Sequence, residues 1–145
     1  MQMVGWREWV ALPELGLARI KCKVDTGART SALHAFEVQP FVQQGEPWVR
    51  FAIHPVQGNT QLQQWCEARV VDQRMVTDSG GHRSQRFFIR TLLRLGPFSY
   101  PIDMSLTNRD SMKFRMLLGR QALKQYSFLV NSSTSYLQPW QESTA

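Results

Sequence analysis

Short stretches of this chain alternate between apolar and polar residues, and turn-forming residues repeatedly interrupt the alternation. The alternating runs are rich in Val, Ile, Phe, Trp and Thr, and the interruptions contain Gly, Pro, Asn or Asp. This pattern is typical of a mostly β protein that folds as a barrel or a sandwich. It predicts strands over residues 4–11, 17–24, 31–38, 47–54, 64–77, 83–95, 98–106 and 127–137.

Two glycine-containing segments predict hairpin turns. Asp78-Ser79-Gly80-Gly81 lies between two of the longest predicted strands, and Gly96-Pro97 lies between the next two. Glycine supplies the positive φ angles that such turns need. One helix is predicted from Gly119, because residues 120–124 are good helix formers.

Length and composition limit the number of domains and the class of protein. With 145 residues and 43% hydrophobic content, the chain suits a single domain, which we expect over residues 1–140 with a disordered tail at 141–145. No stretch approaches the roughly 18 apolar residues of a membrane span, and the N-terminus is not a secretory signal, so a soluble, cytoplasmic protein without a membrane partner is expected. Cys22 and Cys66 lie in strand-like runs rather than in a CxxC pair, which favours buried thiols in a reducing compartment.

The formal net charge of +6 comes mainly from arginine. A nucleic-acid surface would explain it. Arginines at every other strand position, however, are also expected on the solvent-exposed face of a sheet. Neither a Lys/Arg run nor an RNA-stacking motif accompanies them. We therefore expect no nucleic-acid partner and favour an acidic substrate or partner instead.

The motif Asp25-Thr26-Gly27 has two interpretations. These are common turn residues, so Asp25 is either a solvated residue that caps its own loop or a functional carboxylate. Residues 22–24 form a strand that delivers Asp25 into the turn, the Thr26 hydroxyl can bond a neighbouring backbone, and Gly27 permits a close approach. Far downstream, residues 116–120 place an apolar strand and Gly-Arg at the start of the helix.

Three blocks together, DTGARTSALHA, RTLLRLG with YPIDMSLTNRD, and FRMLLGRQAL, resemble the retropepsin-like aspartic endopeptidases. Within that superfamily they are similar to a bacterial family labelled ATP-dependent zinc proteases, whose members are often associated with ATP-grasp ligases. The resemblance covers roughly residues 4–137. It implies a closed, mainly antiparallel β-barrel of the retropepsin or acid-protease half-lobe type, with one short C-terminal helix.

The resemblance also implies the chemistry. In this class two aspartates share one proton and hold a water molecule between them. The resemblance therefore implies that Asp25, Thr26 and Gly27 are catalytic. It also requires a second aspartate. Asp78 in Asp-Ser-Gly could supply it within one chain. However, the chain is short for two lobes, and it has one supporting apolar-apolar-Gly block, Leu117-Leu118-Gly119, followed by Arg120. We therefore expect a symmetric homodimer that pairs two Asp25 residues, with Thr26 bracing the loops and the N-terminal edge strands and 127–137 as interface candidates.

Substrate contacts follow from the same resemblance. The expected residues are Ala28, Arg29, His34 and the flap Asp78, Ser79, Gly80, Gly81 and His82. Many retropepsins carry an aspartate where this chain has Arg29, and that aspartate pairs with the arginine of Gly-Arg. Either Arg120 finds another acid, such as Asp103 or Asp110, or Arg29 points into the cleft and meets an acidic substrate group.

No cofactor or metal is expected. The three histidines and two cysteines show neither HExxH nor CxxC spacing, and no phosphate-binding GxxxxGK[ST] loop occurs, so any ATP dependence would belong to a partner. The leading expectation is hydrolysis of peptide or related amide bonds. The alternatives are a non-catalytic module that binds a peptide or carboxylate for an ATP-grasp ligase and, third, a metal-dependent hydrolase.

Overall fold

The computed structural model describes residues 2–54, 61–77, 80–108 and 114–139. Its elements are β1 (Met3–Val4), β2 (Arg7–Leu12), the 3-10 helix η1 (Pro13–Leu15), β3 (Leu17–Val24), β4 (Ser31–His34), β5 (Phe36–Gln43), β6 (Glu46–Ile53), β7 (Gln64–Thr77), β8 (Arg83–Leu95), β9 (Phe98–Thr107), β10 (Met116–Leu118), α1 (Arg120–Gln125) and β11 (Leu129–Val130). The predicted mainly β fold with a short α-helix is confirmed, and α1 begins within one residue of the predicted start.

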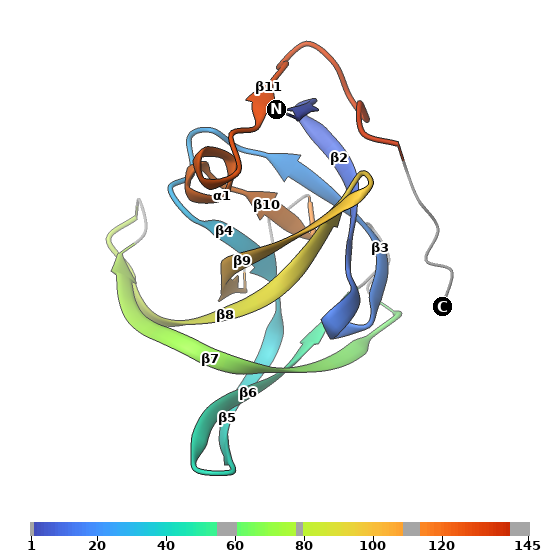
Figure 1. Ribbon diagram of the computed structural model, residues 1–145. Helices are drawn as coiled ribbons and strands as arrows, with labels where there is room; N and C mark the ends of the chain where they lie inside the picture. The colour runs from blue at the N-terminus through green and yellow to red at the C-terminus, as the bar shows by residue number, and fades with distance from the viewer. Residues whose placement is uncertain (1, 55–60, 78–79, 109–113, 140–145) are drawn as a thin grey trace.

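Most strands join one curled sheet (Figure 1). Its order is β2-β3-β10-β4-β9-β8-β7-β6-β5, and an additional pairing of Ala11 with Arg94 joins β2 to β8. Neighbouring strands are mostly antiparallel, but β10 runs parallel to β3 and β4 runs parallel to β9. A small parallel sheet of β1 and β11 brings the two ends of the described chain together.

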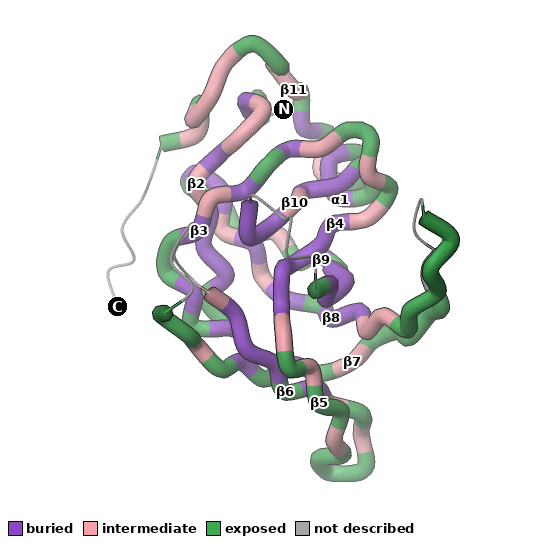
Figure 2. The backbone as a smooth tube through the Cα atoms, turned by 180° about the vertical axis from the view of Figure 1, so that it is seen from behind, coloured by how far each residue is buried: buried purple, intermediate pink, exposed green. Residues whose placement is uncertain are grey.

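Alternating burial explains why these segments become strands. In β3 the side chains of Ile20, Cys22 and Val24 are buried, whereas Arg19 and Lys23 are exposed. Successive side chains of a strand point to opposite faces, so the curled sheet collects the apolar set on its inside. Figure 2 shows the buried backbone concentrated in β3, β4, β6, β8 and β10.

Both predicted hairpins are confirmed. The register of β7 with β8 pairs Thr77 with Arg83, so the predicted turn lies between them, although Asp78 and Ser79 fall outside the described residues. Leu95 pairs with Phe98, which leaves Gly96-Pro97 as the connection, with φ of 63° at Gly96.

The predicted strand over 127–137 is wrong. Only Leu129–Val130 is a strand, and the chain then turns at Asn131, whose side-chain oxygen accepts a hydrogen bond from the Ser133 backbone N–H at 3.1 Å. Such local side-chain bonds compete with a sheet ladder. The following segment still docks on β2, because the Tyr136 N–H donates to the Arg7 carbonyl at 2.9 Å. The predicted strands 4–11 and 31–38 are each divided in two, around Gly5–Trp6 and at Ala35.

The prediction of buried thiols is confirmed. Cys22 and Cys66 are buried and form no disulfide. Burial raises the pKa of the Cys66 thiol to about 11. Burial also raises the pKa of Cys22, and the nearby Glu8 carboxylate adds to this effect. Within the described part of the chain, no helix has the length and apolar character that crossing a membrane requires.

Candidate active site around Asp25

Asp25 lies just after β3, in a loop fixed to β10 and α1 by backbone hydrogen bonds. The Asp25 N–H donates to the Leu118 carbonyl at 2.9 Å, and the Arg120 N–H donates to the Ala28 carbonyl at 2.8 Å. The Gln121 N–H donates to the Arg29 carbonyl at 3.1 Å. The first N–H groups of a helix have no partner within the helix. Here two of them donate hydrogen bonds to carbonyl oxygens of the loop instead.

The Asp25 side chain is half-buried, and one of its oxygens anchors the turn. Oδ1 accepts a hydrogen bond from the Gly27 N–H at 3.0 Å. The other oxygen, Oδ2, makes no hydrogen bond with the rest of the described chain. Asp25 therefore caps its own loop, as the turn interpretation requires, and still presents a carboxylate oxygen that can accept a proton or bind a water.

Leu117, Leu118 and Gly119 lie beside this loop, between the strands that flank it. Leu118 pairs with Val24 on β3, and Leu117 pairs with Ala32 on β4, so β10 lies between the strands on either side of the loop. A Cβ atom on Gly119 would lie 2.5 Å from the Thr30 carbonyl. The Gly119 N–H also donates to the Ser31 hydroxyl at 3.0 Å. Only glycine permits this close approach of the two backbones.

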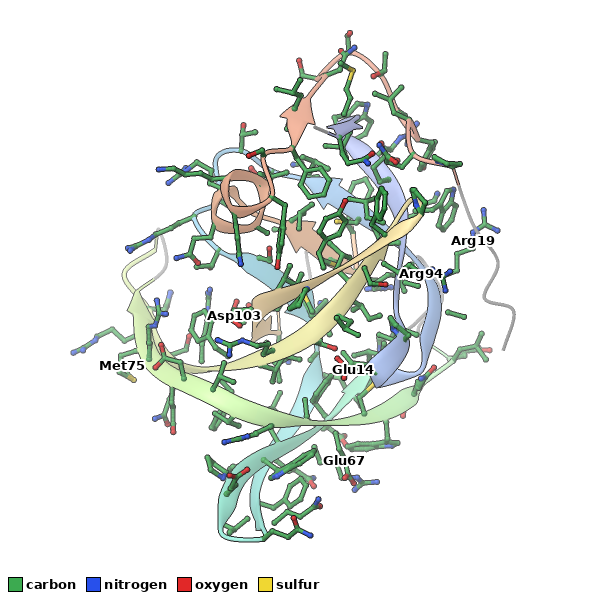
Figure 3. The ribbon with its side chains drawn as sticks, in the orientation of Figure 1. Glu14, Arg19, Glu67, Met75, Arg94 and Asp103 are labelled. Carbon is green, nitrogen blue, oxygen red and sulfur yellow. The ribbon has the colours of Figure 1, made fainter. Side chains whose placement is uncertain are left out.

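Arg120 binds the loop through backbone oxygens rather than through an acid. Its Nη1 donates to the Thr26 carbonyl at 3.0 Å and to the Gly27 carbonyl at 3.2 Å. Asp103, labelled in Figure 3, instead pairs with Arg90 at 2.7 Å. The predicted alternative of an Arg120–Asp103 pair is therefore wrong, and Asp110 lies outside the described residues.

A cavity of about 710 Å³ lies against the exposed side of the loop. Thr26 and Arg29 line it from the loop, Arg120 and Lys124 from α1, and apolar residues from the segment that follows the helix. The apolar lining residues after α1 are Phe128, Leu129 and Val130. Thr26 and Arg29 are exposed, so both are available to a ligand or to a second protein chain.

The other predicted substrate residues lie in different places. Ala28 is half-buried in the loop, and His34 is buried on β4, where its N–H donates to the Arg115 carbonyl at 2.8 Å. His34 is not among the residues that line the cavity. Gly80, Gly81 and His82 are exposed at the β7–β8 tip, and Figures 1 and 2 place this tip on the same side of the molecule as the Asp25 loop.

The described residues contain no group of three or more His, Cys, Asp or Glu side chains placed to hold a metal ion. His54 has a structural role in packing. Its ring stacks on Phe36 with centroids 4.4 Å apart, and its Nδ1 lies 3.0 Å from the Leu62 carbonyl oxygen.

The model of the family described as "Retropepsin-like aspartic endopeptidase RimB" matches residues 3–141. The chain belongs to the RimB-like family. This confirms the retropepsin-like part of the resemblance. The family description names an aspartic endopeptidase, so the zinc-protease label is not confirmed.

Curated relatives of this RimB-like chain carry another name. A protein of Shewanella pealeana is 44% identical over 134 residues, which are 92% of this chain and 29% of the relative. A protein of Parasynechococcus marenigrum is 46% identical over 121 residues, which are 83% of this chain and 26% of the relative. Each is named "Probable alpha-L-glutamate ligase", and the chain spans less than a third of their length.

A solved structure shares the fold. A Legionella pneumophila protein of unknown function superposes with a TM-score of 0.79 over 94% of this chain and 97% of its own, at 24% identity. The likeness extends over nearly all of both chains, so the two proteins share the overall fold.

Sequence reasoning missed one buried carboxylate on β2. Glu8 is 1% exposed, and its Oε2 accepts hydrogen bonds from the N–H groups of Gly5 at 2.7 Å and Leu137 at 2.9 Å. Its Oε1 accepts from the Gln138 N–H at 3.0 Å. Glu8 shares the alternation phase of the buried residues Val10 and Leu12, and this signal could have found it.

Sequence reasoning also passed over the cations Arg7, Lys21 and Lys23 on β2 and β3. Arg7 pairs with Lys23 in the antiparallel register. The alternation of β3, in which Cys22 and Val24 are buried, already puts Lys21 and Lys23 on the opposite face.

Proposed function

We propose that two copies of this chain form a symmetric homodimer that hydrolyses peptide or related amide bonds, with one water activated between two Asp25 side chains. The observation that carries the proposal is the Asp25 loop. Its backbone is fixed by β10 and α1, while one carboxylate oxygen makes no hydrogen bond with the part of the chain that the structure describes. Membership of a family described as aspartic endopeptidases supports it.

The chemistry requires the pair. One ionised Asp25 takes a proton from the water as it attacks the carbonyl carbon, and the protonated Asp25 of the second copy donates a hydrogen bond to the carbonyl oxygen. Like charges at close range raise one pKa of the pair and lower the other. The rate should therefore fall at high pH as the second proton leaves, and fall at low pH as both carboxyls become protonated.

The proposed assembly gives each predicted residue a role. Thr26 is exposed and meets its counterpart across the axis, with Gly27 beside it. Ala28, Arg29 and His34 contribute to the substrate cleft, and the flap from Asp78 to His82 covers an extended substrate by strand-like backbone hydrogen bonds. In this proposal the curled sheet serves as a closed half-lobe barrel, and the pairing of Ala11 with Arg94 favours that closure.

Cleavage of a peptide library by wild type and Asp25→Asn tests the proposal. Asn keeps the hydrogen bond from the Gly27 N–H but cannot take up a proton, so cleavage should fall at least about a thousandfold while the fold and the dimer persist. Sedimentation and circular dichroism check the dimer and the fold. Equal activity of the two proteins, or turnover by a monomer, would refute the dyad.

A second candidate is a binding module for a ligase. It is favoured by the relatives named probable alpha-L-glutamate ligase, in which the matching region makes up less than a third of the length. In this alternative the cleft holds a peptide or carboxylate for an ATP-grasp ligase domain, without turnover. Saturable peptide binding by wild type, with no product after long incubation, would favour it over hydrolysis.

A further inference from the structure

A second cavity, of about 500 Å³, lies between α1 and the strands β8 and β9. Residues 121, 122, 125 and 126 line it from the helix and its C-terminal end, whereas residues 120, 123, 124 and 127 line the cavity beside Thr26. An α-helix has about 3.6 residues per turn, so these two sets lie on different faces of α1. Gln121 lines both cavities, but no residue of the Asp25 loop is among the described residues that line this second one.

The strand side of the second cavity carries an ion pair. Arg90 on β8 and Asp103 on β9 pair directly across the two strands. Arg90 Nε donates to Oδ1 of Asp103 at 2.7 Å, and Nη2 donates to Oδ2 at 3.3 Å. A guanidinium has further N–H donors, and each carboxylate oxygen has a further lone pair, so both partners can also bond a ligand. They are the charged members among the described residues that line the cavity, so their charges cancel there.

The helix side of the second cavity carries two amide side chains. Gln121 and Gln125 are four residues apart, so they are neighbours on one face of α1. Neither amide makes a hydrogen bond with the rest of the described chain. Each amide offers N–H donors and an acceptor oxygen to a ligand. The Tyr126 hydroxyl donates to the Pro101 carbonyl, which ties the end of the helix to β9 and holds the two sides of the cavity together.

We propose that the second cavity binds a free α-amino acid, with its carboxylate on Arg90 and its ammonium on Asp103. A fixed ion pair favours a ligand that carries both charges, because Asp103 repels a simple anion and Arg90 repels a simple cation. In a free amino acid both charged groups are attached to one carbon. This suits two partners whose own charged atoms are 2.7 Å apart. The two glutamine amides add a donor for the carboxylate and an acceptor for the ammonium.

Longer peptides and neutral polyols fit the ion pair less well. Consecutive Cα atoms are about 3.8 Å apart, so even a dipeptide separates its ammonium from its carboxylate by a whole residue. A polyol carries no charge and would form weaker hydrogen bonds with Arg90 and Asp103 than charged groups do. The inference does not depend on peptide hydrolysis, because Asp25 takes no part in this cavity.

Nuclear magnetic resonance of the full nitrogen-15-labelled chain measures the binding, because the side-chain amide signals of Gln121 and Gln125 report on the cavity directly. The first probe is L-alanine. Propionate lacks its ammonium, ethylamine lacks its carboxylate, L-alanyl-L-alanine separates the two charges, and glycerol has neither. Each probe is added up to about 100 mM, because such small molecules bind with millimolar affinity.

Arg90→Gln with Asp103→Asn removes both charges and leaves neither one without its partner. The matched control, Arg69→Gln with Glu46→Gln, removes another exposed ion pair, which joins β7 to β6. Circular dichroism checks that both variants are folded.

We expect L-alanine to bind at least about tenfold more tightly than each of the other probes. Its affinity should fall at least about tenfold in the Arg90/Asp103 variant and less than about twofold in the control. The inference would be overturned if L-alanine caused no saturable shift of the two amide signals. Equally tight binding of any other probe, or equal losses in the two variants, would also overturn it.

Discussion

At the scale of single residues, Arg120 shows how this chain stabilises its aspartate loop without the acid that many retropepsins use. Because its guanidinium binds the carbonyls of Thr26 and Gly27, the loop needs no carboxylate at position 29. Position 29 can therefore carry an arginine, which lines the edge of the cavity. The sequence alone showed the missing acid but not its replacement, because backbone acceptors carry no residue-type signal.

Gly119 gives a prediction at this scale. Gly119→Ala would place a Cβ 2.5 Å from the Thr30 carbonyl, so either β10 or the Asp25 loop must shift. We expect a loss of about 2 to 4 kcal/mol in the free energy of unfolding. Urea denaturation measures it.

Gly45→Ala is the matched control. A Cβ at Gly45 meets nothing within 4 Å, but its φ is +75°, so only the strain of the left-handed backbone, about 1 kcal/mol, is expected. Gly119 has an extended backbone, with φ of −94°, so strain of this kind does not contribute there. A loss at Gly119 no larger than the loss at Gly45 would show that the close approach of the two backbones does not make glycine necessary.

At the scale of elements, the parts that follow local rules were predictable and the parts made by distant segments were not. Alternating burial indicated β3, and glycine turns indicated the two hairpins. The strand predicted over 127–137 does not form, because the chain makes a local turn at Asn131. The segment after the turn still docks on β2. The placement of β10 between β3 and β4 depends on segments far apart in sequence and was not predicted. The family resemblance pointed only to Leu117, Leu118 and Gly119 as support for the Asp25 loop.

Glu8 gives a prediction at the scale of elements, because it ties the C-terminal segment to β2. In Glu8→Gln the side chain has nearly the same shape, but one carboxylate oxygen becomes an NH2 group that faces a backbone donor. We expect a loss of about 2 to 3 kcal/mol in the free energy of unfolding. Hydrogen exchange should increase first at the N–H groups of Leu137 and Gln138.

Glu67→Gln, which changes an exposed side chain on β7 (Figure 3), serves as the control and should alter stability by less than about 0.5 kcal/mol. A Glu8→Gln protein with unchanged stability and unchanged exchange at Leu137 and Gln138 would show that the segment is held by its backbone pairing with β2 alone.

At the scale of the whole molecule, one end of the structure combines features that suit self-association. Met3 and Leu129 pair in the small β1–β11 sheet and are 47% and 48% exposed. Leu129 also lines the cavity that reaches Thr26. Exposed apolar side chains beside the Asp25 loop mark a surface that a second chain can cover. In the proposed dimer, a two-fold axis through this region would bring the Asp25 loops together.

The proposed dimer therefore predicts that a charge at this surface separates the subunits. Leu129→Asp should weaken dimerisation at least about a hundredfold, because the carboxylate would be buried without a partner, and peptide cleavage should be lost with it. Val42→Asp is the control, since Val42 is 74% exposed on β5 at the edge of the large sheet. Sedimentation velocity over a concentration series measures both. If Leu129→Asp remains dimeric, the axis lies elsewhere; if it becomes monomeric and still cleaves, one Asp25 suffices and the pair is not the catalyst.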